Sequence, residues 1–327
     1  MKTGLLLPTW TGAINGVTPS TRDILAFARQ AVVAGFDSLW VSDHFLNEPY
    51  VDFAAINVQF PDEYAGVKAG AWECWTLMAA LAASVAGVTL GTLVSNTGFR
   101  NPALLARMID TVDDLSGGRV VAGLGAGDFP TEHRAFGYAF EHRIARFEEA
   151  LAIIRPLLRG ESSNFAGEFY RTDGATLLPK GPRPGGPPIL IGTLRGGPRM
   201  LRLVAQFADH WNCMLPFADS RPPSYNAAWH GMLAACDKHG RDPATLARNV
   251  TVGVCLGDYG YPLPGAQPLR GSTSEIFDHC ATYAELGVET LSMVVEPCTR
   301  ASLDALAPVL AQIARSAAAK TSSPTGS

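Results

Sequence analysis

The sequence has few charged residues and shows no sign of a membrane span or of a nucleic-acid-binding surface. Charged residues make up 17% of the 327 positions, and 26 Lys and Arg against 30 Asp and Glu leave a formal charge of −4. A nucleic-acid-binding protein would carry a basic patch, so this class is disfavoured. No run of about 18 apolar residues is free of charge or glycine, so no membrane partner is expected. The apolar run at the start is too short for a signal peptide, which predicts a cytoplasmic protein.

The patterns of disulfide frameworks, metal sites and serine hydrolases are also missing. Six cysteines are scattered without a CxxC spacing, and seven histidines form no HxH or HExxH pattern. We therefore expect reduced core cysteines and no metal site. There is no GxSxG nucleophile elbow, which argues against a serine hydrolase. Hydrophobic residues make up 47% of the chain, which is enough for a large buried core.

Apolar runs of strand length alternate with segments of helical period eight times along the chain. The strands are continuous apolar runs, as expected for strands that are covered on both faces. Eight such units at this length predict an α/β fold, a TIM (β/α)8 barrel, rather than a doubly wound sheet. The predicted strands are 4–9, 38–42, 88–94, 119–124, 188–191, 210–214, 250–256 and 290–295, and the predicted helices are 21–34, 75–85, 102–115, 143–158, 198–208, 225–239, 274–286 and 303–314.

No linker divides the chain, so residues 1–315 are predicted to form a single domain. The segment 316–327 is small and polar and is predicted to be a disordered tail. Two insertions, 45–72 and 258–271, follow predicted strands two and seven, on the face where barrel enzymes carry their sites. Their aromatic residues either line an apolar substrate pocket or pack as surface loops. A third insertion, 160–186, is predicted to be a β-excursion away from the site.

Asp43 and His44 follow the second predicted strand, and a Gly-rich segment follows the fourth. Histidine exchanges protons near neutral pH, although a helix cap and a polar loop residue would leave the same pattern. The segment 123–128 reads GLGAGD, in which glycines permit close backbone approach to a ligand. It does not match the dinucleotide fingerprint GxGxxG. Asp128 and Glu132 add carboxylates at the same rim, where solvated loop acids are the simpler alternative.

The fifth predicted strand runs through the segment 192–198, GTLRGGP, directly into a helix. Free backbone N–H groups and the helix dipole favour an anion there, and Arg195 and Arg199 could add charged hydrogen bonds. This is the best phosphate candidate, although an ordinary loop would have the same glycines. Small and polar residues at 91–96, followed by Arg100, leave the third strand, where simple strand termination is the alternative.

Taken in order along the chain, these motifs resemble the bacterial luciferase-like family of flavin- and deazaflavin-dependent oxidoreductases. The resemblance implies a TIM barrel with the cofactor ring in its mouth and the cofactor phosphate near the fifth strand. The segments that carry it are GFDSLWVSDHF (35–45), WECWTLMAALA (72–82), the stretch 88–137, RFEEALAII (146–154), PPILIGTLRGGPRMLRLVAQFADHWN (187–212) and GVETLSMVV (287–295).

Within that family the SDH motif and the segment 123–132 look most like the branch that uses the deazaflavin coenzyme F420. There His44 resembles the proton donor or acceptor, and Asp128 resembles its glutamate partner, one methylene shorter, with Glu132 assisting. The resemblance also implies a cis peptide bond between Leu93 and Val94. The implied cofactor-binding residues are Asp43, Leu93, Val94, Asn96, Gly125, Ala126, Gly127, Thr131, Gly192, Thr193, Arg195, Gly196, Gly197, Arg199 and Met200.

Three functions are compatible with this pattern. The leading hypothesis is an F420-dependent oxidoreductase that transfers a hydride between the deazaflavin and a small organic substrate. The alternative is an FMN-dependent luciferase-like monooxygenase that uses reduced FMN and O2. A non-catalytic flavin-binding barrel is the third. The resemblance further suggests a homodimer.

Overall fold

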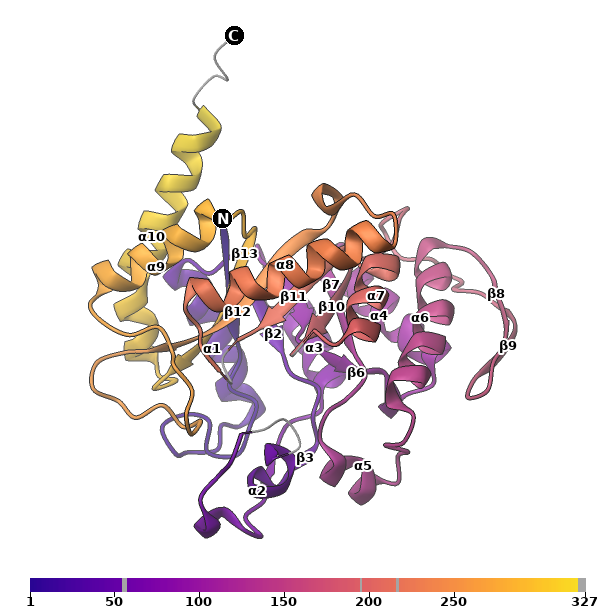
Figure 1. Ribbon diagram of the computed structural model, residues 1–327, viewed down its shortest axis with the longest axis horizontal. Helices are drawn as coiled ribbons and strands as arrows, with labels where there is room; N and C mark the ends of the chain where they lie inside the picture. Colours follow the sequence, from indigo (N-terminus) through magenta and orange to yellow (C-terminus); the bar gives the residue numbers. More distant parts are fainter. Residues whose placement is uncertain (55–57, 195, 216–217, 323–327) are drawn as a thin grey trace.

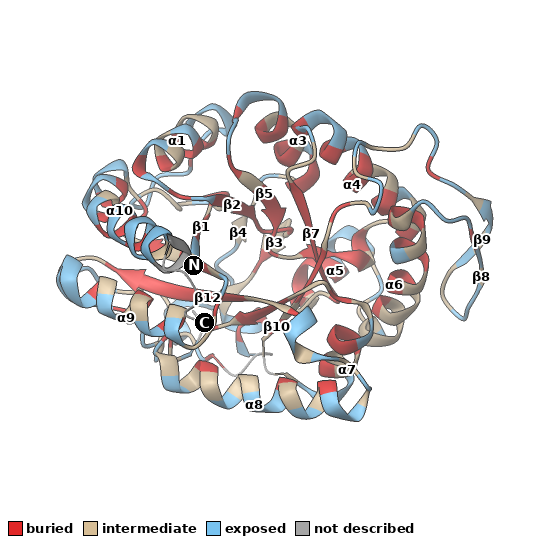
Figure 2. Cartoon of the chain, turned by 90° about the horizontal axis from the view of Figure 1, so that it is seen from above, coloured by how far each residue is buried: buried red, intermediate tan, exposed pale blue. Residues whose placement is uncertain are grey.

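The chain forms a closed barrel of eight parallel strands, seen here in a computed structural model that describes residues 1–54, 58–194, 196–215 and 218–322. The strands pair in chain order, and pairing of the fifth barrel strand with the fourth closes the ring. The predicted TIM barrel is confirmed (Figure 2). The barrel strands are β1 (Lys2–Leu6), β2 (Ser38–Val41), β5 (Thr89–Thr92), β7 (Val120–Gly125), β10 (Ile189–Thr193), β11 (His210–Met214), β12 (Ala247–Cys255) and β13 (Thr290–Glu296).

Eight helices surround this barrel as an outer ring (Figure 2). Local signals set their ends: Ser20 forms a capping box with Asp23, and Gly35 ends the same helix in the left-handed conformation, at φ 108°. The helices are α1 (Thr21–Ala34), α3 (Cys74–Ser84), α4 (Pro102–Ser116), α6 (Arg143–Arg159), α7 (Pro198–Phe207), α8 (Pro222–Lys238), α9 (Thr273–Glu285) and α10 (Arg300–Ser322).

Several predicted boundaries differ from the structure. β1 ends at Leu6 rather than residue 9, because Pro8 has no N–H to continue the ladder. β5 ends at Thr92, after which the chain passes through a bulge into the short strand β6 (Ser95–Asn96). The prediction of a disordered tail is wrong for residues 316–322. These residues continue α10, since alanine is the strongest helix former. Residues 323–327 lie outside the described residues.

Two apolar layers hold the barrel. Outward-facing strand residues such as Leu5, Leu39 and Val250 belong to a large cluster shared with the helices. A smaller cluster fills the barrel interior around Trp40 and Leu190. A side chain on either Gly4 or Gly91 would overlap the Trp40 ring, so these glycines make room for a large indole on the barrel axis. The interior is therefore packed up to the level of the strand exits.

The insertions add structure at the rim. The segment after β2 contains a hairpin of β3 (Leu46–Asn47) and β4 (Ala69–Gly70), with α2 (Pro49–Asp52) and the 3-10 turn η2 (Asp62–Tyr64). An unpredicted helix, α5 (Pro130–Phe136), follows β7 and lies with α2 and β3 at one end of the molecule (Figure 1). The predicted β-excursion is confirmed as the antiparallel pair β8 (Ser163–Ala166) and β9 (Arg171–Ala175), beside α6. Two further 3-10 turns are η3 (Thr97–Phe99) and η4 (Pro243–Thr245).

Candidate active site

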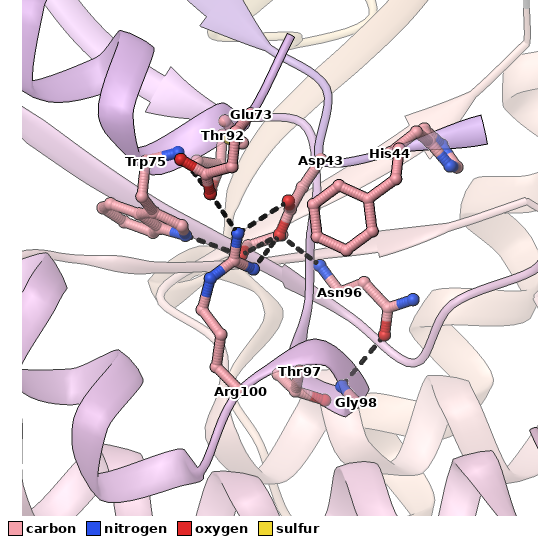
Figure 3. A network of polar contacts seen from close by, with 12 residues as sticks. Asp43, His44, Glu73, Trp75, Thr92, Asn96, Thr97, Gly98 and Arg100 are labelled. Carbon is pink, nitrogen blue, oxygen red and sulfur yellow. Dashed lines mark hydrogen bonds and ion pairs between the residues drawn. The ribbon is translucent and has the colours of Figure 1, made fainter. Parts of the chain in front are cut away.

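Asp43 lies just beyond β2 and is almost fully buried, with its carboxylate turned into a polar network (Figure 3). Its Oδ2 accepts hydrogen bonds from Ser95 Oγ at 2.7 Å and from the backbone N–H of Asn96 at 3.1 Å. The guanidinium of Arg100 contacts both carboxylate oxygens, at 2.6 and 3.1 Å. The structure thus places Asp43, a predicted cofactor contact, in an ion pair that holds the chain between β5 and α4.

Arg100 also contacts Glu73, which caps α3 by accepting the backbone N–H of Thr76 at 2.7 Å. Burial alone would lower the pKa of Arg100, but Asp43 and Glu73 outweigh it and raise the pKa above its ordinary value. The Trp75 indole donates to Ser95 Oγ at 2.9 Å and closes the network. The guanidinium of Arg100 therefore holds together the segments that follow β2 and β5 and the start of α3.

His44, the next residue, points away from Arg100 (Figure 3) and meets a different acid. Its Nδ1 lies 2.8 Å from Oε1 of Glu132, which is fully buried on α5. The other oxygen of Glu132 accepts the backbone N–H of Phe45 at 2.8 Å. Because an ionised carboxylate only accepts, Nδ1 carries the proton, and Nε2 has no hydrogen-bond partner among the described residues. The acid that contacts His44 is Glu132, whereas the family pattern implied Asp128.

The imidazole of His44 lies between two aromatic rings, and its side chain is 19% exposed. The ring centroid of Phe129 is 4.6 Å away in a stacked arrangement, and that of Trp10 is 5.2 Å away. Burial lowers the pKa of His44, but the charge and hydrogen bond of Glu132 outweigh it and raise the pKa to about 9. His44 is therefore an imidazolium at neutral pH, with one N–H held and one free.

Asp128 is half-buried at the same rim, and its side chain makes no hydrogen bond to any described residue. Burial raises the pKa of its carboxyl, an effect that Glu132 adds to and the charge of His44 opposes. It adds negative charge near His44 without touching it.

The bulge after β5 forms one wall of the mouth, and the peptide bond between Leu93 and Val94 is cis, as the family resemblance implies. Leu93 is buried in the interior cluster, and Val94 is half-buried above it. A Cβ on Gly125 would lie 2.5 Å from Cγ2 of Val94, and one on Gly192 would lie 3.0 Å from Cγ1. These two glycines therefore make room for the Val94 side chain.

Gly127 makes room for a second polar unit. It has a φ of +79°, and a Cβ there would lie 2.8 Å from Asn96 Cγ and from His133 Nε2. Asn96 Nδ2 donates to His133 Nε2 at 2.9 Å, because Nδ1 of that histidine donates to the carbonyl of Ala139. Burial lowers the pKa of His133, which keeps it neutral. Both ends of the Asn96 side-chain amide are therefore hydrogen-bonded within the protein. Ala126, which precedes Gly127, is buried in the outer core.

Thr131 is different, because its Oγ1 is buried and finds no hydrogen-bond partner in the described part of the chain. Its backbone N–H is accepted by the fully buried Asp52 at 3.0 Å. Asp52 also accepts the backbone N–H of Glu48 at 2.7 Å, so it ties the first insertion to the start of α5. The insertion in this way fixes the helix that carries Glu132.

The strand-five exit leads into α7, whose N-terminus has no side-chain cap from the described residues. Gly197 is the N-cap residue, and open space surrounds the position of a Cβ on it. A cavity of about 440 Å³ lies beside this loop, lined by Thr193, Leu194 and Gly196 and by residues of β11 and α8. Free N–H groups beside a cavity are what an anionic cofactor tail requires.

The other residues that were predicted to bind the cofactor near this loop either contact other groups of the protein or lie outside the described residues. Thr193 Oγ1 accepts from the Trp211 indole at 2.8 Å. Arg199 is half-exposed and pairs with Glu148 on α6 at 2.9 Å. Met200 is half-buried against the outer core. Arg195 lies outside the described residues.

Both long insertions contribute to an apolar roof near His44, which we define as Phe53, Val58, Phe60, Phe129 and Leu263. Phe53, Val58 and Phe129 are buried together, with Phe60, Leu263 and Trp10 packed against them. Of the two alternatives for these insertions, packing is seen for Phe53, whose ring lies 5.1 Å from that of Phe60 and 5.2 Å from that of Phe129, whereas a substrate pocket lined by them stays a prediction. Sequence reasoning missed Trp10, Glu73, Arg100 as an ion-pair partner, and Phe129.

These features define a class of protein: a TIM barrel with a buried acid–histidine pair and an apolar roof at the C-terminal mouth. The family model described as luciferase-like monooxygenase matches residues 1–259. The chain therefore belongs to the luciferase-like monooxygenase family, which is a family of oxidoreductases.

Among curated relatives, the chain is 34% identical over 183 residues to 5,10-methylenetetrahydromethanopterin reductase of Archaeoglobus fulgidus, covering 56% of this chain and 46% of that protein. It is 31% identical over 249 residues to phthiodiolone/phenolphthiodiolone dimycocerosates ketoreductase of Mycobacterium tuberculosis, covering 73% and 62%. The matches thus span 46% to 62% of the length of these two relatives.

Solved structures share the fold at low identity. An F420-dependent secondary alcohol dehydrogenase in complex with an F420-acetone adduct superposes with a TM-score of 0.73 at 18% identity, covering 94% of this chain and 97% of that one. The monooxygenase RslO1 from Streptomyces bottropensis has a TM-score of 0.73 at 20% identity, covering 96% and 100%. Within the described residues, no helix has the length and apolar character needed to cross a membrane.

Proposed function

We propose that the protein is an F420-dependent oxidoreductase that transfers a hydride between the deazaflavin and a carbonyl or alcohol carbon of an organic substrate. The observation that carries this proposal is the 2.8 Å contact between Nδ1 of His44 and Oε1 of Glu132, which leaves Nε2 without a hydrogen-bond partner among the described residues. Reduction of a carbonyl needs one proton for the new hydroxyl oxygen. A histidine with a pKa of about 9 is protonated at neutral pH and can supply it.

Each neighbour of His44 has a definite part in this step. Glu132 fixes the ring through Nδ1, so that Nε2 is the atom that gives or takes the proton. Phe129 stacks on the ring and Trp10 lies against it, so both restrict how it can turn. In the reverse direction, the Nε2 of a neutral His44 would accept the alcohol proton. When bound, the reduced deazaflavin would supply the hydride.

The residues present fit such a cofactor at two places. The uncapped N-terminus of α7 at Gly197, beside the cavity lined by Thr193 and Gly196, suits its anionic tail. The unpartnered Oγ1 of Thr131 suits a polar edge of the ring, and the bulge at Val94 would support the ring. The homodimer stays a prediction that family membership favours.

The second candidate is an FMN-dependent monooxygenase. The observation that favours it is the apolar roof, in which Phe53 and Leu263 come from the two separate insertions and close over the mouth. A closed, dry site suits oxygen chemistry as well as hydride transfer. The structural neighbours include a monooxygenase, so the choice rests on cofactor preference.

Parallel equilibrium titrations with F420 and FMN test the proposal. We expect micromolar or tighter binding of F420 and at least tenfold weaker binding of FMN. Mass spectrometry and absorbance of the purified protein would identify any cofactor that copurifies. Tight FMN binding with negligible F420 binding would overturn the proposal in favour of the monooxygenase.

A variant at the α7 N-terminus tests the tail site. Gly197 has a φ of −57° and open space around it, so a side chain fits there without strain. Gly197→Asp places a negative charge where the cofactor anion would bind, and we expect at least tenfold weaker F420 binding. Gly197→Asn, of the same shape but neutral, is the matched control and should change binding less than threefold. Equal behaviour of the two variants would place the anion elsewhere.

A further inference from the structure

The exits of β12 and β13 carry polar groups that the proposed proton transfer does not use. Glu296 is the last residue of β13 and pairs in register with Cys255 of β12. Leu291, Met293 and Val295 belong to the outer core. Because side chains alternate along a strand, Glu296 faces the barrel axis.

The strand register gives the height of Glu296 relative to His44. Gly4 of β1 lies opposite Ser38 on one side and opposite Ser292 on the other. Counted in register, Glu296 therefore corresponds to Ser42, the first residue after β2 and two residues before His44. Only β1 separates β13 from β2, so these two strands are about 10 Å apart along the barrel wall.

Tyr261 comes from the second insertion and reaches the same wall. A Cβ on Gly253 would lie 2.7 Å from Cζ of Tyr261. Gly253 faces the axis, because Val252 and Val254 face the outer core. The phenol of Tyr261 therefore lies over the inner face of β12, and its buried Oη has no hydrogen-bond partner among the residues described. A buried hydroxyl without a partner is costly, which points to a group that binds there.

We propose that Glu296 and Tyr261 form a substrate-recognition pair for an uncharged oxygen group, on the part of the mouth wall that is separated by β1 from the strand leading to His44. The pair selects an elongated, largely apolar compound with a hydroxyl or carbonyl at its far end. Tyr261 donates to that oxygen, and the Glu296 carboxyl accepts from a hydroxyl or, in its protonated form, donates to a carbonyl. This inference rests on the proposed function for the position of the reacting carbon.

Charge and packing around the pair support an uncharged, apolar ligand. Burial raises the pKa of the Glu296 carboxyl to about 7, so it is partly protonated near neutral pH. A carboxylate ligand would be repelled as Glu296 and Asp128 ionise. Arg270, on the same insertion, contacts the Tyr259 carbonyl instead. The apolar roof, which includes Phe60 and Leu263, offers a dry surface for the body of such a molecule.

Calorimetric binding of three probes to the purified full-length protein tests this pair without relying on turnover. The probes are 4-(4-hydroxycyclohexyl)cyclohexanone, its parent 4-cyclohexylcyclohexanone and the corresponding 4-(4-oxocyclohexyl)cyclohexanecarboxylate. We expect the hydroxylated probe to bind at least fivefold tighter than the parent, and the carboxylate to bind weakest at pH 8. Glu296→Leu and Tyr261→Phe should each weaken the hydroxylated probe by about fivefold to tenfold, as for one hydrogen bond, and leave the parent unchanged.

Two controls separate recognition from structural damage. Glu296→Gln keeps the hydrogen-bonding shape and should retain the hydroxylated probe within threefold while improving the carboxylate. Tyr259→Phe changes a tyrosine that is 38% exposed and should leave all three probes unchanged. No preference for the hydroxylated probe, or equal losses for it and its parent, would overturn the recognition pair. If the preference is present but F420 fails to bind, only the proposed function is wrong.

Discussion

Asp43 and His44 are consecutive residues at one strand exit, yet they belong to two regions with opposite properties. The Asp43 network, made of Asp43, Glu73, Ser95 and Arg100, is closed: the guanidinium touches both oxygens of Asp43 and reaches Glu73. In the His44 pair, made of His44 and Glu132, one ring N–H of His44 has no partner among the described residues, and the His44 side chain is 19% exposed. Both regions contain buried charge, so charge alone does not mark the chemistry. The feature that distinguishes the His44 pair is a ring N–H that no described residue accepts.

The two regions also differ in how each holds its charge. Arg100 joins elements that are 27 and 57 residues away in sequence, which makes it a cross-link of the scaffold. Among the described residues, the Glu132 carboxylate hydrogen-bonds only with His44 and with the backbone N–H groups of Phe45 and Leu46. We therefore expect substitutions in the His44 pair to change catalysis far more than folding, and substitutions in the Asp43 network to do the reverse.

The largest effect is expected for His44→Ala. Loss of the general acid proposed above should lower kcat/KM by about 10²- to 10⁴-fold, measured for the proposed reduction of a ketone by reduced F420. His44→Gln can keep a hydrogen bond to Glu132 but cannot transfer a proton, so it should lose as much activity while staying folded. Unchanged kcat/KM in either variant would remove His44 from the mechanism.

Arg100→Met should have the largest effect on stability. It leaves the buried carboxylate of Asp43 without its cation, and breaking a buried ion pair costs about 3–5 kcal/mol. The matched control is Arg221→Met, which removes the exposed ion pair with Asp219, at 2.7 Å, and should cost less than about 1 kcal/mol. Urea unfolding of both variants measures the difference. Similar losses would mean that the Asp43 network is not the cross-link described here.

The fold could be predicted because its signals are local. Capping residues such as Ser20 and Gly35, and proline at the start of α4, mark helix ends in the sequence itself. The predicted end of β1 was wrong because Pro8, which has no backbone N–H, stops the strand at Leu6. The helix α5 was missed although Pro130 begins it and Gly137 ends it in the left-handed conformation, which is a usable signal.

The site could be predicted only as far as the strand exits. His44 was identified because it follows a predicted strand, but its acid depends on α5, which turns Glu132 rather than Asp128 toward it. The glycines at 125 and 192 were expected to spare a cofactor, yet they make room for Val94. The pairing of Arg100 with Asp43 spans 57 residues and leaves no local pattern, so only the closed barrel reveals it.

The smallest expected effect is a difference in how the free energy of unfolding depends on pH with and without the His44 pair. The folded pKa of His44 is about 9, above its ordinary value of 6.5, so the folded state holds a proton that the unfolded state loses first. Stability from this pair is therefore fully present below pH 6.5 and is lost as pH rises through 9. Over that range the wild type should lose about 2–3 kcal/mol more of its free energy of unfolding than His44→Gln, which does not titrate. The measurement is urea unfolding at pH 6 and pH 10, in which the Asp43 network keeps its charges because arginine does not deprotonate there. Parallel losses in the two proteins would show that Glu132 does not hold an imidazolium, and the contrast between the two regions would then rest on exposure alone.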